Sequence, residues 1–372
     1  MKLIKHKIKN LIRVVDERNE IGIKSFYGIN INKEFMPTVA NTEGLDEKKY
    51  KVVRKGRFVY SGMQTGRDCC IRISMYNEEA PVLVSPAYTT FEVSATQTVL
   101  PIYFFMIFLS SEMDRFGAFC SDGSIRSNLD WEVFCNIEIS LPPIVIQQKY
   151  VDVYNAMISN QQKYARGLED IKLVCDGYIE ELRRKLPCKE IGAYICQKNN
   201  RNTDKRIDRV VGLSTKKEFR EAQSRVNRNE LGNYKIVEPN EFAFVPTTDT
   251  WKVLAFALNE NKQPVVVSPI YEVFGVDIES LLPAYLSLWL SRNEFDRYAR
   301  YNSWGSAREN FTFEEMKRVR IPIPDISTQL AIANINAVCV ERKRINEQLK
   351  KCIRKLCPIL IKGSLEEARK EV

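Results

Sequence analysis

Two short polar loops carry the side chains best suited to contact another molecule. They span residues 121–128 and 303–310, and each places Gly-Ser, an Arg and an Asn at the same spacing. Glycine lets a phosphate approach the backbone closely, while Arg and Asn hydrogen-bond to phosphates or to base edges. The alternative is a helix–strand turn capped by Ser and Asn side chains. The loop residues predicted to contact DNA are Ser124, Arg126, Asn128, Trp304, Ser306, Arg308 and Asn310.

Two further segments mix basic side chains with amides. In residues 54–72 the arginines accompany Gln64 and Thr65, and in residues 199–228 they alternate with asparagines. Lys and Arg neutralise phosphates, whereas Arg, Asn and Gln also make bidentate contacts to bases. A basic loop that is simply solvated is the alternative. The residues predicted to contact DNA here are Arg54, Arg57, Gln64, Arg67, Arg72, Arg201, Arg206, Arg225 and Arg228.

The sequence lacks the residue patterns on which most catalytic sites depend. Its one histidine, His6, excludes His pairs, His-rich metal sites and a well-placed Ser-His-Asp triad. No phosphate-binding loop, dinucleotide glycine motif or nucleophile elbow occurs, and the ten cysteines form no Cys-x-x-Cys pair. The Asn/Asp-Pro-Pro-Tyr/Phe tetrapeptide of adenine methyltransferases is also missing, because Leu141 stands at the polar position of the nearest match. We therefore expect no catalytic centre, cofactor or metal site.

Length and charge limit the architecture and the partners. With 372 residues, of which 44% are hydrophobic, the chain can form two or three ordinary domains. Its net charge of +9 permits binding to nucleic acid without requiring it. The charged first residues do not resemble a signal peptide, and the longest apolar run, residues 99–109, is about half a membrane span. We expect a cytoplasmic protein without a membrane partner.

The elements that must position these loops occur twice. Tyr50-Lys-Val-Val returns as Tyr234-Lys-Ile-Val, a shift of 184 residues. Val84-Ser-Pro-Ala-Tyr returns as Val267-Ser-Pro-Ile-Tyr at a shift of 183, and the two polar loops correspond at a shift of 182. Ordered matches with so small a drift indicate a duplicated domain pair, since the unit is too long for a solenoid repeat.

Each half begins with a mixed segment and ends with a helical one. In residues 1–142 and 187–324, short apolar runs such as Phe58-Val-Tyr60 predict buried strands. Residues 100–114 and 282–298 are each predicted to form one helix, with a proline in the first turn. These two segments are therefore expected to be α+β domains, and residues 143–186 and 325–372 are expected to be helical.

The two helical segments carry heptad seams, in which spacings of four and three alternate. Such a seam keeps one stripe of a helix against a partner helix. The helices could instead pack on their own globular domains, but we expect them to pair with each other, antiparallel. Pro358 is expected to break or kink the second helix. The predicted seam residues are Tyr154, Met157, Tyr164, Leu168, Ile171, Tyr178, Leu182, Ile335, Cys339, Leu349, Ile353 and Leu356.

With these features the chain resembles, over essentially its whole length, the specificity (S) subunit of type I restriction-modification systems. The supporting motifs are Gly123-Ser-Ile-Arg126 and Gly305-Ser-Ala-Arg308, each followed by a proline-rich stretch that leads to a helix-starting glutamine, Gln147 or Gln329. The resemblance implies an α+β fold in which two duplicated target-recognition domains are separated by an antiparallel coiled coil of two long helices. It also implies a non-catalytic subunit whose domains each recognise half of a bipartite site in double-stranded DNA.

The resemblance further implies two methyltransferase (modification) subunits docked on the helices, and restriction endonuclease-translocase subunits joined to that core. Adenine methylation and ATP-driven cleavage would belong to these partners. A helix of about 40 residues spans roughly 60 Å, enough to reach DNA grooves one to two turns apart. Because the two sets of loops differ, we expect two different half-sites around an unread spacer. The alternatives are a self-sufficient DNA-modifying enzyme and a coiled-coil scaffold or RNA-binding module.

Overall fold

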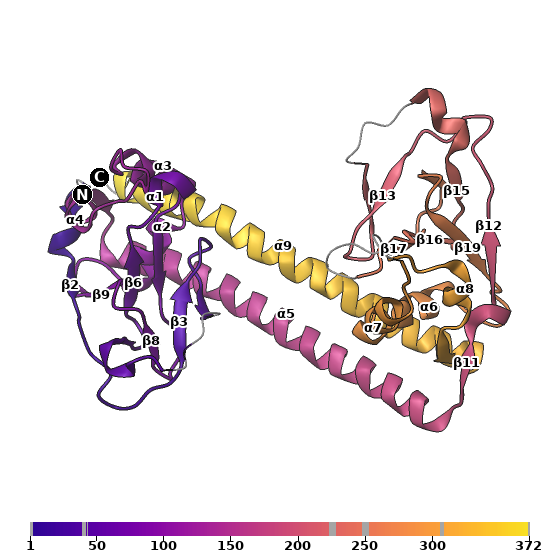
Figure 1. Ribbon diagram of the computed structural model, residues 1–372. Coiled ribbons are helices and arrows are strands. Elements are labelled where there is room, and N and C mark those ends of the chain that lie inside the picture. Colours follow the sequence, from indigo (N-terminus) through magenta and orange to yellow (C-terminus); the bar gives the residue numbers. More distant parts are fainter. Residues whose placement is uncertain are drawn as a thin grey trace. The chain divides into compact units, whose positions relative to one another are not determined.

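The computed structural model describes residues 3–38, 42, 44–222, 228–247, 253–305 and 309–370 of the chain (Figure 1). It divides into two compact units, the first made of residues 1–164 and 345–372 and the second of residues 165–344. Each unit contains one α+β domain together with one part of each long helix.

The two α+β domains have the same order of elements. The elements of the first domain are β1 (Ile4–Lys7), η1 (Ile8–Asn10), β2 (Ile12–Val14), β3 (Phe26–Ile29), β4 (Phe35–Pro37), η2 (Glu47–Lys49), β5 (Lys51–Val53), β6 (Phe58–Ser61), α1 (Thr65–Asp68), β7 (Arg72–Met75), β8 (Val82–Val84), β9 (Thr89–Val93), α2 (Pro101–Phe108), α3 (Ser111–Phe119), α4 (Trp131–Asn136) and β10 (Glu138–Leu141). The long helix α5 (Ile144–Lys185) follows.

The second domain repeats this order, except that its described residues contain no counterpart of α1. Its elements are β11 (Cys188–Glu190), η3 (Ile191–Ala193), β12 (Ile195–Lys198), β13 (Val211–Leu213), β14 (Phe219–Glu221), η4 (Arg228–Asn233), β15 (Lys235–Val237), β16 (Phe242–Phe244), β17 (Phe256–Leu258), β18 (Val265–Val267), β19 (Glu272–Val276), α6 (Pro283–Leu290), α7 (Asn293–Tyr301), α8 (Phe313–Lys317) and β20 (Arg320–Pro322). The second long helix is α9 (Ile326–Lys370). Corresponding elements start 182 to 185 residues apart, as the sequence repeat predicts.

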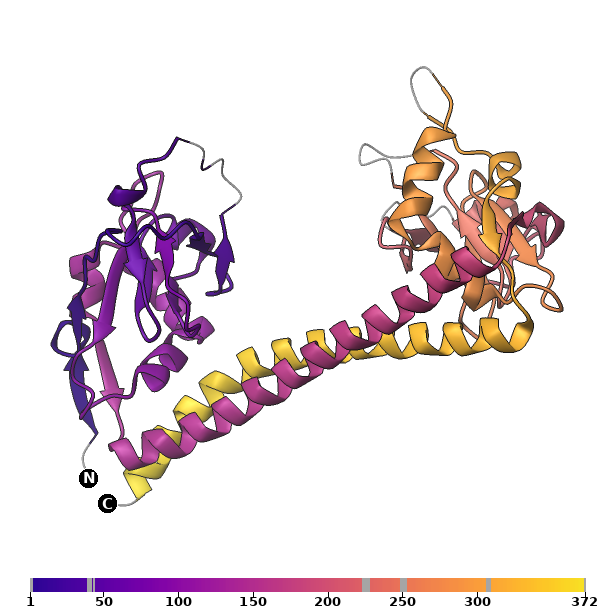
Figure 2. The same cartoon turned by 90° about the horizontal axis from the view of Figure 1, so that it is seen from below.

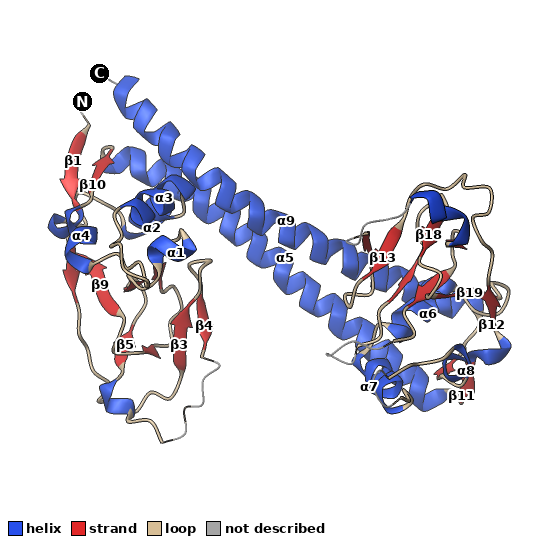
Figure 3. Ribbon diagram, turned by 45° about the horizontal axis from the view of Figure 1, so that its top comes forward, coloured by secondary structure: helices blue, strands red, loops and turns tan. Residues whose placement is uncertain are grey.

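The sheets of the two domains share one topology (Figure 3). One four-stranded sheet has the order β2-β9-β6-β7 in the first domain and β12-β19-β16-β17 in the second. The first domain's other sheet is β4-β3-β8-β5; in the second domain the pairs β13-β14 and β15-β18 are connected by a parallel bridge between Val210 and Val266. A two-stranded ladder, β1-β10 or β11-β20, brings the start of each domain beside the strand that leads into the long helix.

The cores are built from equivalent aromatic side chains. Phe58 stacks on Phe91 with ring centroids 5.0 Å apart, and Phe242 stacks on Phe274 at 4.9 Å. All four rings are fully buried on neighbouring strands. Stacked aromatic pairs add about 1 kcal/mol beyond their buried area, so the duplicated pattern of Phe residues specifies the same core twice.

The helix predicted over residues 100–114 is two helices, α2 and α3, and that predicted over 282–298 is α6 and α7. In the first domain the Ser110 side chain accepts a hydrogen bond from the Glu112 amide, so a new helix starts inside the predicted one. Both α2 and α6 begin with a proline, as expected.

Helices α5 and α9 pack side by side and antiparallel within each unit (Figure 2). In the first unit Gln161 donates to Asn346 at 2.8 Å, and Lys149 pairs with Glu367 farther along both helices. The expected break at Pro358 is wrong, because α9 continues through that residue to Lys370. The predicted fold class, two similar α+β domains with two long antiparallel helices, is confirmed.

Two seam predictions are wrong by one position. Tyr178 is 49% exposed and Leu356 is 40% exposed, whereas the next residues, Ile179 and Cys357, are buried. An α-helix has 3.6 residues per turn, so its buried stripe drifts away from a strict heptad. The other ten predicted seam residues are buried or partly buried: Tyr154, Met157, Tyr164, Leu168, Ile171, Leu182, Ile335, Cys339, Leu349 and Ile353.

Candidate nucleic-acid interface

In the first domain two connections meet at one end of the β6–β7 hairpin. The Gly66 amide donates to the Ser127 carbonyl at 2.9 Å, and the Leu129 amide donates to the Gly62 carbonyl at 2.8 Å. We call residues 62–71 and 120–130 the loop face of the first domain. It brings together six predicted contact residues: Gln64, Arg67, Arg72, Ser124, Arg126 and Asn128.

The loop is held by the carboxylate of Asp122. This group accepts hydrogen bonds from the Ser124 hydroxyl at 2.6 Å and from the Asn128 amide at 2.9 Å, and these bonds lower its pKa. The Asn128 side chain in turn accepts from the Gln64 amide at 3.1 Å. The capped-turn alternative therefore describes what Ser124 and Asn128 do in this structure, and their contact with DNA stays a prediction.

Arg126 is the side chain of this loop best placed to contact a partner. It is exposed and, within the described residues, forms no ion pair. Arg67 is also exposed, 3.4 Å from Asp68, whereas Arg72 is half-buried and ion-paired with the same carboxylate. The loop face thus presents two accessible guanidinium groups that could bind phosphates or base edges.

Arg54 and Arg57 do not reach the loop face. They lie before β6, at its opposite end, and a four-residue strand spans about 13 Å. Both pair with Glu17, at 2.6 and 2.5 Å, and the hydrogen bond from Arg54 is the largest cause that lowers the pKa of that carboxyl. Their DNA contact is not tested, but their charge is already matched within the domain.

The second domain builds the same loop face from different side chains. The Phe311 amide donates to the Pro246 carbonyl at 2.8 Å, and Thr247 and Asn310 share a hydrogen bond at 2.9 Å. Trp304 occupies the position of Asp122, with its amide bonded to the Asn310 carbonyl, and its side chain is 70% exposed. The predicted contacts Ser306 and Arg308 lie outside the described residues.

The other basic residues predicted in this domain lie away from that loop face. Arg201 forms a bridge with Lys235, at the start of β15, and donates to the Asn233 carbonyl at 2.7 Å. Arg206 is exposed and pairs with Asp204 at 3.0 Å. Arg225 and the side chain of Arg228 lie outside the described part of the chain.

Part of the sequence repeat encodes a buried ion pair. Lys33 binds Asp114 at 2.5 Å, and Lys217 binds Asp296 at 2.9 Å; the two aspartates belong to the repeated Asp-Arg dipeptides. Both lysines sit at positive φ in equivalent hairpin turns and also donate to a backbone carbonyl. The 184-residue shift from Lys33 to Lys217 was a signal that could have revealed them.

The helix-starting glutamines fasten each domain to its long helix. The fully buried Gln147 accepts from the Leu100 amide at 3.0 Å and donates to the carbonyls of Thr98 and Pro142, each at 2.8 Å. Gln329 makes the equivalent bonds to Leu282, Ser280 and Pro324. One side chain thereby connects the start of α2 or α6 to the start of α5 or α9.

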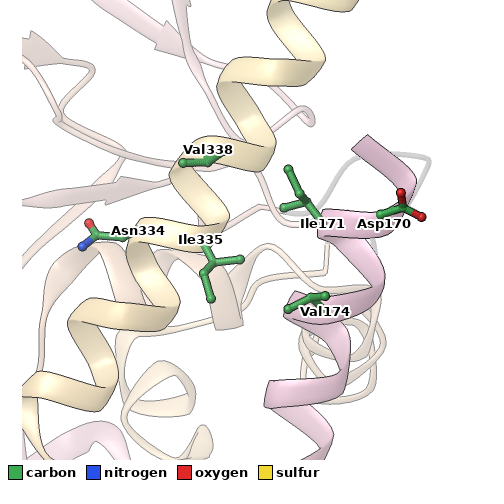
Figure 4. A pocket seen from close by; sticks show the side chains of 6 residues that line it. All are labelled: Asp170, Ile171, Val174, Asn334, Ile335 and Val338. Atoms are coloured by element: carbon green, nitrogen blue, oxygen red, sulfur yellow. The ribbon is translucent and has the colours of Figure 1, made fainter. Parts of the chain in front are cut away.

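In the second unit the helices also leave an apolar groove open between them (Figure 4). It has a volume of about 420 Å³ and is lined by four aliphatic side chains, with Asp170 and Asn334 at its margin. Val174 and Val338 in this groove are about half exposed. Exposed apolar surface of this kind is typical of protein contacts rather than of DNA contacts. The aliphatic lining residues are Ile171, Val174, Ile335 and Val338.

Two searches of the described part of the chain gave no site. No described helix is both long enough and apolar enough to cross a membrane. Nor do the described residues group three or more His, Cys, Asp or Glu side chains in a way that could hold a metal ion.

Comparison with solved structures identifies the class of fold. The S subunit of a type I restriction-modification system from M. genitalium matches with a TM-score of 0.59 at 10% identity, over 98% of this chain and 96% of that one. The HsdS subunit of Thermoanaerobacter tengcongensis (TM-score 0.39, 13% identity, 97% and 96% coverage) and a chain from a type I R-M system assembly (0.46, 12%, 98% and 100%) are also found. No family model and no curated protein matches the sequence. The chain has the fold of a type I restriction-modification S subunit.

Proposed function

We propose that this protein is the DNA sequence-specificity subunit of a type I restriction-modification complex and has no catalytic activity of its own. The observation that carries the proposal is the S-subunit fold over 98% of the chain, with both domains duplicated element by element. Each domain would bind one half of a split DNA site through its loop face. Exposed arginines there would contact phosphates or guanine edges.

The two half-sites should differ, because equivalent loop positions carry different chemistry. Asp122 in the first loop is replaced by Trp304 in the second, and Ser127 is replaced by Glu309. An anionic side chain and an indole favour different base-pair edges, since one accepts hydrogen bonds and the other offers apolar surface. The recognised sequence is therefore expected to be bipartite and asymmetric, with a spacer that neither domain contacts.

The long helices would set the spacer length and dock the partners. Helices of 42 and 45 residues are about 63 and 68 Å long at 1.5 Å per residue, compared with about 34 Å for one DNA turn. Two methyltransferase subunits would dock on them, and the apolar groove beside Val174 and Val338 offers surface for such a contact. Restriction endonuclease-translocase subunits would join that core. Adenine methylation by base flipping would take place in the methyltransferase subunits.

The test is to express the chain with a candidate methyltransferase subunit, purify the complex and map methylated adenines in the host DNA. We expect co-purification and one asymmetric bipartite motif. Methylation or nicking by the purified chain alone would establish a DNA-modifying enzyme instead. Stable binding to RNA without sequence-specific binding to duplex DNA would establish an RNA-binding module.

A matched pair of variants locates the first half-site. Arg126→Gln removes the free guanidinium of the first loop face, and we expect relaxed recognition in one half of the motif only, because a bidentate base contact contributes about 1–3 kcal/mol. Arg115→Gln is the control, since Arg115 is equally exposed on α3 but pairs with Glu112 on the same helix at 2.8 Å. An unchanged motif for Arg126→Gln would argue against a base contact by this side chain.

A further inference from the structure

The first domain has almost no net positive charge of its own. Residues 1–142 contain 18 Lys and Arg against 17 Asp and Glu. Protein–DNA affinity depends largely on phosphates neutralised by Lys and Arg. If this domain binds half of a DNA site, further cations must come from another part of the same unit.

Helix α9 supplies such cations next to the first domain. Between residues 342 and 355 it carries seven basic residues and one acidic residue. Lys350, Lys351 and Lys355 are exposed and form no ion pair with any described residue. Elsewhere on the two helices, by contrast, cations are matched by carboxylates three or four positions away, as in Arg344–Glu341 and Lys185–Glu181.

This arrangement costs helix stability. Lys350 and Arg354, and likewise Lys351 and Lys355, are like charges four residues apart, and such pairs destabilise a helix by about 0.2–0.5 kcal/mol each. The equivalent positions of α5, 182 residues earlier, hold Leu168, Glu169 and Leu173. The cluster is therefore a feature of α9 alone and not of the repeat, which favours a binding role over a role in helix pairing.

A chain of contacts connects this part of α9 to the loop face of the first domain (Figures 1 and 3). Arg354 donates to the Asn32 side chain at 2.7 Å and to Glu34 at 3.2 Å, both in the β3–β4 turn. The same turn reaches the loop face, because Lys33 donates to the Ile71 carbonyl at 2.9 Å. The three unpaired lysines thus follow directly on a surface that carries free arginines.

We propose that Lys350, Lys351 and Lys355, the α9 stripe, bind the phosphates of the spacer DNA that adjoins the half-site of the first domain. The inference rests on the proposed function and extends it, because spacer DNA would then be held without being read. Phosphate contacts position a protein on DNA but carry no base information. The stripe accordingly adds affinity that is independent of the spacer sequence.

The test compares two full-length variants that lose the same charge. Lys350→Gln/Lys351→Gln/Lys355→Gln removes the stripe, and Lys7→Gln/Lys24→Gln/Lys48→Gln removes three exposed lysines of the first domain away from the loop face. Gln and Lys have similar helix propensities, so α9 should stay folded. Fluorescence anisotropy measures the affinity of each chain for a duplex that contains the mapped motif, between 50 and 200 mM salt.

We expect the slope of log affinity against log salt concentration to be shallower by about 2.7 in the stripe variant, at roughly 0.9 per lost phosphate contact. The control variant should keep the wild-type slope, and a duplex ending at the first half-site should bind both variants equally. Equal slopes for the stripe variant and the control would overturn the inference, as would loss of methyltransferase co-purification with an unchanged slope. A wild-type chain that does not bind its mapped duplex would instead refute the proposed function.

Discussion

Replacing Gln147 with leucine tests the joint between the first domain and the helix α5. The side chain is fully buried and makes three hydrogen bonds, of 3.0, 2.8 and 2.8 Å, to backbone groups of three segments. Leucine fills a similar volume but cannot replace these bonds, and each buried bond contributes about 1 kcal/mol. We expect Gln147→Leu to destabilise the first unit by about 3 kcal/mol. For a unit of about 190 residues this corresponds to a Tm lower by roughly 6–12 °C.

Urea unfolding followed by circular dichroism measures the free energy, and hydrogen exchange at the Leu100 amide reports the local loss. Gln148→Leu is the control, since its side chain is exposed and bonds only to Asp152 on the same helix; we expect a change within about 0.5 kcal/mol. Gln329→Leu should lower the stability of the second unit instead. If Gln147→Leu and Gln148→Leu unfold at the same urea concentration, the glutamine does not hold the joint.

Two further predictions concern titrating groups. Hydrogen bonds from Ser327, then from Thr328, lower the pKa of Asp325 at the start of α9; a carboxyl with a lowered folded pKa stabilises the protein above its unfolded value of about 4, and this stability is lost as the pH falls further. Urea midpoints measured from pH 6 to 3 should therefore fall less steeply for Asp325→Asn, and parallel profiles would exclude this origin. Burial raises the pKa of the Cys357 thiol to about 12, so mass spectrometry after brief alkylation should find Cys69 labelled and Cys357 unlabelled. Equal labelling of the two would show that α9 does not bury Cys357.

The sequence predicts the duplication well because the repeated residues have structural roles. The Asp-Arg dipeptides contain the aspartates of the buried Lys33–Asp114 and Lys217–Asp296 pairs. In the repeated Ser-Pro-x-Tyr motif, the tyrosine carbonyl accepts from an equivalent lysine, as from Lys51 at 2.8 Å. These contacts must be kept for both copies to fold alike, so they remain visible as similarity.

The details that the sequence missed depend on tertiary packing. A heptad pattern placed Tyr178 and Leu356 on the seam, but the helices also pack against the globular domains, and Ile179 and Cys357 belong to those cores. The pairing of Arg54 and Arg57 with Glu17 could not be foreseen either, since the partners lie 37 and 40 residues apart. Basic composition alone does not distinguish a free cation from one that is already paired.

The most direct test of the account is to remove one heptad from α5 and the facing heptad from α9, and then to map methylated adenines with the methyltransferase partner present. Seven residues shorten a helix by about 10.5 Å, or roughly three base pairs of DNA. We predict the same two half-sites with a spacer about three base pairs shorter. An intact motif with its original spacer would contradict the claim that the paired helices set the distance between the two recognition domains.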